Sequence, residues 1–367
     1  MYRQTTRLYT GGIKLKIFRK SLLIATVFVL FATFSGCSDG INSDNPENPE
    51  DTKISPQSIT FEWQSAYMDK LAEFKNSADF SADVKTGSRF DLFDITGDKT
   101  PELIISPNDN GQTACRIYSC RDGNIIELGE TGNSGTFSYL PDMHLIKDEY
   151  LGDGFILGKY VAYEDGAFNT VISYSDNSMS ASKGATIRYE INGEEVLLPE
   201  YDRELSLYST SPTITAGRKY TFGDNAVNYA IKCSESWGAV LTSTQRELYR
   251  SKLTELLNPL DAIYAFELCD LNSDEIPELI ISNGDMPENY CEVYYFDENE
   301  LAHIDGMFGA YGKFTFDTEK FVMSTGSIRW SINNADFNAN EYTYSESLAE
   351  IGRKYLLTDT NISIALN

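Results

Sequence analysis

Residues 90–106, FDLFDITGDKTPELIIS, contain the stretch that decides the fold, and residues 266–282, FELCDLNSDEIPELIIS, repeat it. In each copy a short apolar segment precedes an acidic loop, and a run of Leu and Ile follows the loop. Short runs of this kind on either side of turn residues are typical of strands. Each copy therefore predicts a strand, an acidic loop and a second strand.

The acidic loop has the form Asp-x-(Thr/Asn)-x-Asp-x-x-Pro-Glu, with oxygen-bearing side chains at positions 1, 3, 5 and 9. Calcium takes about six to eight oxygen ligands, some of them from backbone carbonyls and water. The alternative is an acidic turn whose Asp side chains accept hydrogen bonds from backbone N–H groups. Calcium is favoured because a turn alone does not need the Glu at position 9. The predicted ligands are Asp94, Thr96, Asp98 and Glu102 in the first loop, and Asp270, Asn272, Asp274 and Glu278 in the second.

The loop pattern resembles the calcium loops of dockerins and of integrin-like propeller repeats. It departs from them at position 6, where Lys99 and Glu275 replace the usual Gly. The whole strand-loop-strand stretch also resembles repeats in uncharacterised secreted lipoproteins of anaerobic gut bacteria. This resemblance implies an envelope location and a cation loop, and it implies no activity. Because Asn272 is a better ligand than Thr96, we expect the second loop to bind calcium more strongly.

The repetition extends beyond the loops. A helical period of apolar residues precedes the first loop, and a second such helix begins at the capping-box sequence 242–245, TSTQ. Both halves close on Gly-Arg-Lys-Tyr, at residues 217–220 and 352–355. We therefore predict an α+β fold of two tandem homologous repeats, each a mostly antiparallel sheet with packed helices. The predicted repeat domains are residues 56–232 and 233–367.

Other local patterns predict the remaining elements. Residues 115–130 are expected to form a hairpin, and residues 164–183 an insertion present only in the first repeat. Further elements are expected as strands at 151–163, 170–174 and 185–191, and as helices at 199–208 and 342–351.

The N-terminus predicts a lipoprotein signal peptide at residues 1–37. A basic segment precedes a 14-residue apolar run, which is short for a membrane span. The run ends in FSGC, which resembles the lipobox of bacterial lipoproteins and implies lipidation at Cys37. An ordinary signal peptide is the alternative. Residues 38–55 are rich in Ser, Asp, Asn, Glu and Pro, and predict a disordered linker.

The composition of the chain disfavours several classes of partner and site. The net charge of −25 disfavours nucleic acid as a partner, because phosphate binding needs basic surface. Five cysteines follow Cys37, an odd number that argues against a disulfide framework, although a Cys269–Cys291 bridge is compatible with the strand pattern. His144 and His303 occupy no equivalent positions, which disfavours a repeated His-dependent site.

The expected function is a lipid-anchored, extracytoplasmic calcium-binding protein that acts as a surface binding or scaffolding module. Its partners would be the membrane, through the anchor, and a surface glycan or protein ligand. The alternative is a glycan-active hydrolase that uses an Asp/Glu pair. Two carboxylates facing one cleft outside the loops would favour hydrolysis, whereas a flat strip of aromatic side chains would favour glycan binding.

Overall fold

A computed structural model describes most of the chain after residue 61. The described ranges are 62–83, 86–109, 113–152, 154–183, 186–234, 240–257, 264–297, 300–304, 306–325, 328–331 and 342–367. They belong to one compact unit, Ser58–Asn367. The predicted boundary between residues 232 and 233 falls inside this unit. The predicted signal peptide, the linker and Cys37 lie outside the described residues.

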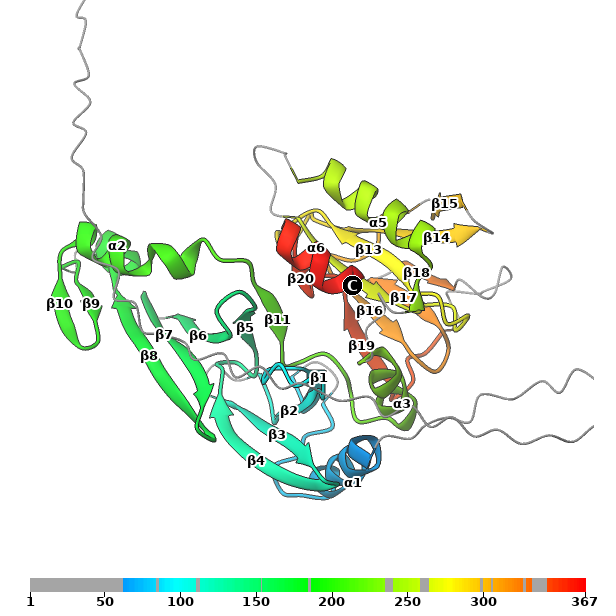
Figure 1. Ribbon diagram of the computed structural model, residues 1–367, viewed down its shortest axis with the longest axis horizontal. Coiled ribbons are helices and arrows are strands. Elements are labelled where there is room, and N and C mark those ends of the chain that lie inside the picture. Colours follow the sequence, from blue (N-terminus) through cyan, green and yellow to red (C-terminus); the bar gives the residue numbers. More distant parts are fainter. Residues whose placement is uncertain are drawn as a thin grey trace, which may run out of the picture. The chain divides into compact units, whose positions relative to one another are not determined.

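The first half begins with a helix and continues mainly as strands (Figure 1). Helix α1 buries Tyr67, Leu71 and Phe74, whose spacing places them on one face. The elements are α1 (Glu62–Lys75), β1 (Arg89–Phe93), β2 (Glu102–Ser106), β3 (Cys115–Arg121), β4 (Asn124–Thr131), β5 (Phe137–Leu140), β6 (Leu145–Gly152), β7 (Phe155–Glu164), β8 (Ala167–Asp176), the 3-10 helix η1 (Ser178–Lys183), β9 (Tyr189–Ile191), β10 (Glu194–Val196), α2 (Leu198–Ser209), β11 (Ile214–Ala216) and α3 (Asp224–Cys233).

The second half has one helix at each end and only strands between them in its described residues. Helix α5 begins at the predicted capping box, in which Thr242 and Gln245 exchange side-chain-to-backbone hydrogen bonds. The elements are α5 (Ser243–Glu255), β12 (Ala265–Cys269), β13 (Glu278–Ser282), β14 (Cys291–Asp297), β15 (Glu300–His303), β16 (Phe314–Asp317), β17 (Val322–Thr325), β18 (Ile328–Ser331), β19 (Leu348–Ile351), β20 (Tyr355–Leu356) and α6 (Asp359–Leu366).

Strands from both halves combine in the sheets. One four-stranded sheet has the order β1-β2-β3-β4 and another the order β18-β17-β16-β19. Tyr220 links these two sheets, because it pairs with Phe90 of β1 and with Ala349 of β19. The third sheet has twelve strands in the order β10-β9-β8-β7-β6-β5-β11-β20-β12-β13-β14-β15. Its centre is the pairing of β11, from the first half, with β20, from the second.

The pairing around Tyr220 recurs around Tyr355 with the halves exchanged. Tyr355 pairs with Phe266 of β12 in its own half and with Ile214 of β11 in the other half. Each half therefore contributes its first hairpins to one sheet and its later strands to another. Because the two Gly-Arg-Lys-Tyr segments make the crossing contacts, the halves interlock at these segments.

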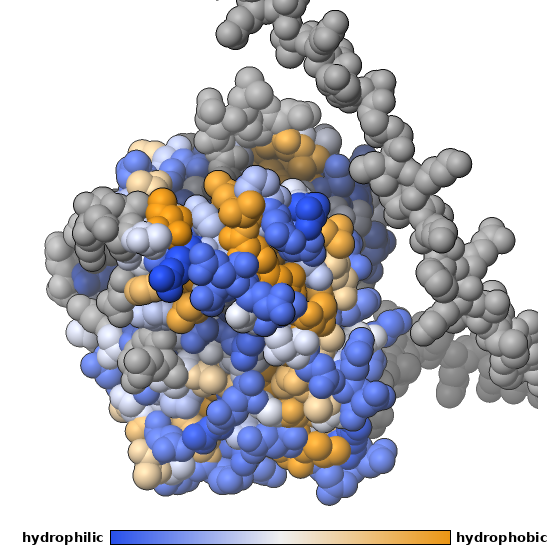
Figure 2. Space-filling view, turned by 90° about the vertical axis from the view of Figure 1, so that its left-hand side faces the viewer, coloured by the Kyte–Doolittle hydropathy of each residue, from blue (hydrophilic) through white to orange (hydrophobic). Residues whose placement is uncertain are grey.

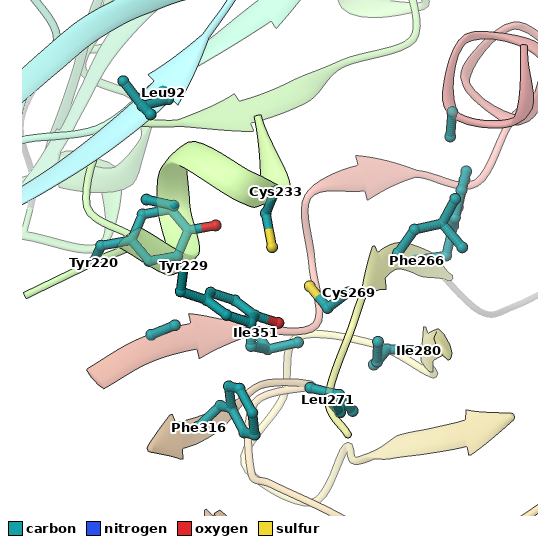
Figure 3. Packing of buried hydrophobic residues seen from close by; sticks show 14 of the residues in the cluster. Leu92, Tyr220, Tyr229, Cys233, Phe266, Cys269, Leu271, Ile280, Phe316 and Ile351 are labelled. Carbon is teal, nitrogen blue, oxygen red and sulfur yellow. The ribbon is translucent and has the colours of Figure 1, made fainter. Parts of the chain in front are cut away.

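The largest hydrophobic cluster also draws on both halves. It contains Phe90 from β1 and Phe266 from β12, both fully buried. Figure 3 shows the close-up of this cluster, in which Cys233 of α3 lies near Cys269 of β12. All five cysteines of the described residues are free thiols, so the Cys269–Cys291 bridge is not formed.

The predicted fold class is confirmed in a coarse form. The described residues form a mixed α/β structure in which strands predominate, and every strand pairing between them is antiparallel. The predicted hairpin at 115–130 and the helix at 199–208 are present as β3–β4 and α2.

Several boundaries differ from those expected. The predicted helix at 342–351 is wrong, because residues Leu348–Ile351 form β19, which pairs with β16 and buries all of its residues except Glu350. The pairing offered by β16 outweighs the local helical pattern. The expected strand at 151–163 is divided by a turn at Gly154, which has a φ of 86°. Residues 164–183 are mostly strand β8 and η1.

Candidate functional site

The first acidic loop connects β1 to β2 and is closed by its own carboxylates. Asp94 accepts hydrogen bonds from the backbone N–H groups of Gly97 (2.7 Å) and Lys99 (3.0 Å). Glu102 is fully buried and accepts one from the N–H of Ile95 at 2.7 Å. Lys99, at position 6, has a φ of 72°, in the left-handed region that Gly adopts most easily. The loop thus keeps the backbone turn of position 6 although it lacks the Gly.

The second loop, between β12 and β13, has the same geometry. Asp270 accepts hydrogen bonds from the N–H groups of Ser273 (2.6 Å) and Glu275 (3.2 Å). Glu278, which is 2% exposed, accepts one from the N–H of Leu271 at 2.6 Å. Glu275 at position 6 also has a φ of 72°. The two loops therefore fold into the same turn in spite of different residues at positions 2, 3, 4, 6 and 7.

Positions 3 and 5 complete the predicted ligand sets. Asp98 and Asp274 are exposed, and each accepts a hydrogen bond of 2.8 Å from the N–H two residues later. The Thr96 hydroxyl donates to Glu102 at 3.2 Å, and the Asn272 amide donates to Asp274 at 2.9 Å. The fold thus gathers all eight predicted residues in two matching loops. Their oxygens suit a hard cation, but they face N–H groups, and no cluster of three or more Asp, Glu, His or Cys side chains within the described ranges is placed to hold a metal.

Each loop is also held by a tyrosine from the preceding helix. The hydroxyl of Tyr67, in α1, donates to the carbonyl of Pro101 at 2.7 Å. The hydroxyl of Tyr249, in α5, donates to the carbonyl of Pro277 at 2.7 Å. Both tyrosines are fully buried. The helices therefore fix position 8 of each loop, directly before the buried Glu.

Burial makes the two Glu carboxyls hard to ionise. It raises the pKa of Glu102 to about 7, against the lowering effect of N–H donors and with a further rise from Asp94. Burial raises the pKa of Glu278 to about 9, and Asp274 adds to the rise. A cation beside these groups would favour their charged forms. The loops consequently hold carboxylates whose ionisation would be coupled to cation binding.

The loops differ in the charge that faces position 1. The ammonium group of Lys232, in α3, lies 2.7 Å from Asp270, whose side chain is 1% exposed. The hydroxyl of Tyr229, also in α3, donates to the Asp270 carbonyl at 2.9 Å. Asp94 has no salt bridge within the described part of the chain. A cation entering the second loop must therefore compete with a lysine that is absent from the first loop.

A second group of charged residues lines a cavity of about 310 Å³. Its lining includes residues of both Gly-Arg-Lys-Tyr segments, 217–220 and 352–355, which are called the crossing segments below. The sequence showed Gly-Arg-Lys-Tyr as a repeated closing segment but gave no reason to expect a site there. The backbone N–H of Gly217 donates to Asp91 at 3.1 Å, and that of Gly352 donates to Glu267 at 2.8 Å. Asp91 and Glu267 hold corresponding places in the two copies of the repeated stretch. That correspondence is the sequence feature from which this cavity could have been found.

The environments of Asp91 and Glu267 move their pKa values in opposite directions. Burial raises the pKa of Asp91, although Lys219 opposes the rise. Burial would also raise the pKa of Glu267, but its close ion pair with Lys219 and the Gly352 N–H lower it below the usual value. Asp91 is 4% exposed and Glu267 is 2% exposed. Two carboxylates whose pKa values are shifted in opposite directions thus line one cavity. Both already accept hydrogen bonds from the protein.

A larger cavity, of about 660 Å³, adjoins the first loop. Asp94 is the only Asp or Glu among its described lining residues, which include Phe93, Tyr139 and His144. Tyr139 and Nδ1 of His144 are hydrogen-bonded at 2.9 Å. This cavity is mostly apolar and lacks a pair of carboxylates.

The exposed surface shows no aromatic strip across the described residues. The exposed aromatic side chains, Phe155, Tyr311 and Tyr344, belong to different parts of the chain. Figure 2 shows one face of the molecule, where hydrophobic side chains form patches between hydrophilic ones. The expected mark of a flat glycan-binding platform is therefore missing from the described surface.

Comparisons with known proteins give no relative. No family model, no curated protein and no solved structure matches this chain. Among the described residues, no helix is both long and apolar enough to cross a membrane.

Proposed function

We propose that this protein is a lipid-anchored, extracytoplasmic calcium-binding module of the bacterial cell envelope, with a binding or scaffolding role. The observation that carries the proposal is the repeated acidic loop. Two loops with different residues at several positions share the same turn, the same buried Glu and the same tyrosine support. The Glu at position 9 closes each turn by accepting the N–H of position 2, and its carboxylate is also the kind of oxygen ligand that calcium takes.

The proposal includes an internal duplication of two homologous repeats. The support is the equal pairing of Tyr220 and Tyr355 and the equal register of the first hairpins. The repeats would be interlocked, because each completes a sheet of the other. A duplication of this kind explains why both loops keep their ligand residues together with their supporting helices.

Calcium binding would require the carboxylates to exchange backbone N–H partners for the cation. Asp98 and Asp274 are exposed, whereas Glu102 and Glu278 are buried. Burial of negative charge is costly, so a divalent cation would stabilise the ionised loop. Because Lys232 competes at Asp270, we place the stronger site in the first loop, which reverses the ranking expected from Asn272.

The test is a thermal and calorimetric titration of the mature protein with calcium. A ligand that binds only the folded form stabilises it by about 2.7 kcal/mol at a hundredfold excess over Kd. Extracellular calcium modules bind at about 10⁻⁴–10⁻³ M. Millimolar calcium should raise the melting temperature, and Asp94→Asn with Asp98→Asn should remove more of the effect than Asp270→Asn with Asp274→Asn. Identical melting in calcium and EDTA would leave the loops as capped turns.

The anchor is proposed at Cys37. The support is the basic and apolar N-terminal sequence, the FSGC segment and the polar stretch that follows. Cells grown with a palmitate analogue should label the protein, and Cys37→Ala should abolish labelling and membrane fractionation. Unchanged fractionation of the variant would show that an ordinary signal peptide, or another attachment, is at work.

Glycan hydrolysis is the second candidate function. It is favoured by the placement of Asp91 and Glu267 in one cavity. The two carboxylates line one cavity and have pKa shifts of opposite sign, a pattern suited to an acid and a base. Their burial and their protein partners favour binding over hydrolysis. Assay of the protein on a panel of oligosaccharides decides between them: turnover lost in Asp91→Asn supports hydrolysis, and no turnover supports a binding module.

A further inference from the structure

The cavity between the crossing segments is cationic in a protein that is otherwise strongly acidic. Five of its lining residues are Arg or Lys, although the chain as a whole carries a net charge of −25. Two of the five are neutralised. Lys219 forms a buried ion pair with Glu267, and Lys313 lies 2.8 Å from Glu350. The three others are Arg218, Arg353 and Lys354.

These three cations have no carboxylate within salt-bridge distance in the described part of the chain. Lys354 lies over the rings of Phe93 and Tyr355, at 6.0 and 5.5 Å from their centroids. Arg218 and Arg353 are half-buried, and burial lowers the pKa of both guanidinium groups. Asp109 acts electrostatically on Arg218 and Asp285 on Arg353, but neither forms a salt bridge, so both guanidinium groups can receive a further anion.

The two arginines are held in matching positions by neutral groups. Arg218 donates to the Ser106 hydroxyl at 3.2 Å and to the Gly87 carbonyl at 2.7 Å. Arg353 donates to the Ser282 hydroxyl at 3.2 Å. A guanidinium group has five N–H donors. Most of the donors on each arginine are therefore left for solvent or a ligand, while the serines fix the direction of the side chain.

Two glycines make room for these contacts. A Cβ at Gly135 would lie 1.8 Å from the Ser106 hydroxyl oxygen and 2.9 Å from Cδ of Arg218. A Cβ at Gly312 would lie 2.0 Å from the Ser282 hydroxyl oxygen and 3.3 Å from Cδ of Arg353. Both glycines also have positive φ angles, of 72° and 65°. The backbone thus excludes side chains where each Ser–Arg pair sits.

We propose that this cavity binds a small anionic molecule, about the size of a monosaccharide, whose oxyanion groups are attracted by Arg218 and Arg353 where these two residues line it. The volume of about 310 Å³ lies at the lower end for small-molecule sites. Guanidinium groups bind carboxylate, phosphate and sulfate through paired N–H donors. The shared chemistry is therefore the oxyanion, and the test separates a carboxylated sugar from phosphate or sulfate.

The acidic residues of the cavity do not cancel this charge. Glu267 and Glu350 already face lysines. Asp285 is exposed, where solvent screens it. Asp91 is buried, and burial raises its pKa toward the neutral form. The cavity thus keeps an excess of positive charge at the two arginines.

The experiment is calorimetric titration of the mature protein, in EDTA, with inorganic phosphate, sulfate, glucuronate and neutral glucose. At least one anion should bind and glucose should not, and added salt should weaken binding. Arg218→Gln and Arg353→Gln should each reduce affinity about tenfold or more, as expected for the loss of one charged hydrogen-bond donor. Arg203→Gln is the control, because Arg203 is exposed on α2 and pairs with Glu204.

A second measurement uses the unaltered protein and does not depend on how the variants fold. Phenylglyoxal modifies accessible arginines, and the binding anion should protect Arg218 and Arg353 but leave Arg203 reactive. No binding of any of the three anions at millimolar concentration would overturn the proposal. So would equal modification with and without the anion. Because EDTA is present throughout, the result is independent of calcium binding by the loops.

Discussion

The two acidic loops have the same turn, yet only the second faces a lysine of the protein. Asp270 lies beside Lys232, whereas Asp94 has no such partner in the described structure. The same asymmetry separates Glu267, which pairs with Lys219, from Asp91. Equivalent carboxylates are therefore neutralised in the second half and left without a salt bridge in the first.

Both lysines come from one segment of the first half. Lys219 lies in the Gly-Arg-Lys-Tyr segment at residues 217–220, and Lys232 lies in α3. Both contact carboxylates of the second half, Glu267 and Asp270. Helix α6, which follows the second crossing segment, contains no Lys or Arg. For the loops, the asymmetry lies in the terminal helices, because α3 carries Lys232 and α6 carries no lysine. The Gly-Arg-Lys-Tyr segments both carry a lysine, Lys219 and Lys354, but only Lys219 forms a salt bridge among the described residues. Under the proposed function, the first loop is therefore the one in which calcium meets no lysine of the protein.

The strongest way to break this comparison is to remove the two buried carboxylates in turn. Glu267→Gln leaves Lys219 buried without a partner and should reduce the free energy of unfolding by about 3–5 kcal/mol. Asp91→Asn leaves one backbone N–H without its acceptor and should cost about 1–2 kcal/mol. Urea denaturation measures both, with Glu255→Gln on the exposed face of α5 as the control. Equal losses would show that the Lys219 pair is not the source of the asymmetry.

The dependence of stability on pH should separate the same two residues. The lowered pKa of Glu267 contributes stability above its ordinary value of 4.5, and this contribution is lost as pH falls through the folded value. The raised pKa of Asp91 has the opposite sign, because its contribution is present below 3.8 and is lost as pH rises through the folded value.

Urea midpoints of both variants, measured from about pH 2 to pH 8, give the test. Relative to the unaltered protein, Glu267→Gln should lose less stability on acidification, and Asp91→Asn should lose less as the pH rises. Parallel curves for all three proteins would contradict the assigned shifts.

Lys232→Met should sharpen the comparison of the loops. In a background where Asp94→Asn and Asp98→Asn remove the first site, the change frees Asp270 from its lysine. Because Lys232 is 38% exposed, its pairing is partly screened, and calcium affinity in the second loop should rise about fivefold, equivalent to roughly 1 kcal/mol. Calorimetry measures the affinity, and Lys252→Met, in α5, is the control. An unchanged or weaker affinity would remove Lys232 as the competitor.

The smallest effect tests what the loops share. Lys99→Gly and Glu275→Gly relieve a left-handed residue in the same turn. A residue with a side chain is strained by roughly 1–2 kcal/mol in the left-handed region. Gly relieves this strain but loses more conformational entropy on folding, so each change should stabilise the protein by up to about 1 kcal/mol. Thermal melting of the two variants in EDTA should show similar increases. A gain in one loop only would mean that the turns are less alike than their φ angles indicate.

The sequence by itself determined the local features of this protein. The short apolar runs on either side of the acidic loops, in residues 90–106 and 266–282, predicted the hairpins, and the capping box at Thr242 predicted the start of α5. The repeated spacing of acidic residues indicated two matching loops, and the two loops have the same turn at position 6. These features depend on residues within about ten positions of each other, where periodicity and turn chemistry act directly.

Only the tertiary structure decided which halves share a sheet, where the lysines lie and how the cavity is lined. Residues 342–351 carry a helical pattern, yet Leu348–Ile351 pair with β16 because that edge and the core behind it were available. Lys232 meets Asp270, and Arg218 meets Ser106, across long intervals of the chain. Such contacts depend on how helices and strands pack against one another. A local pattern of charge or hydropathy does not identify the distant residue that a side chain will contact.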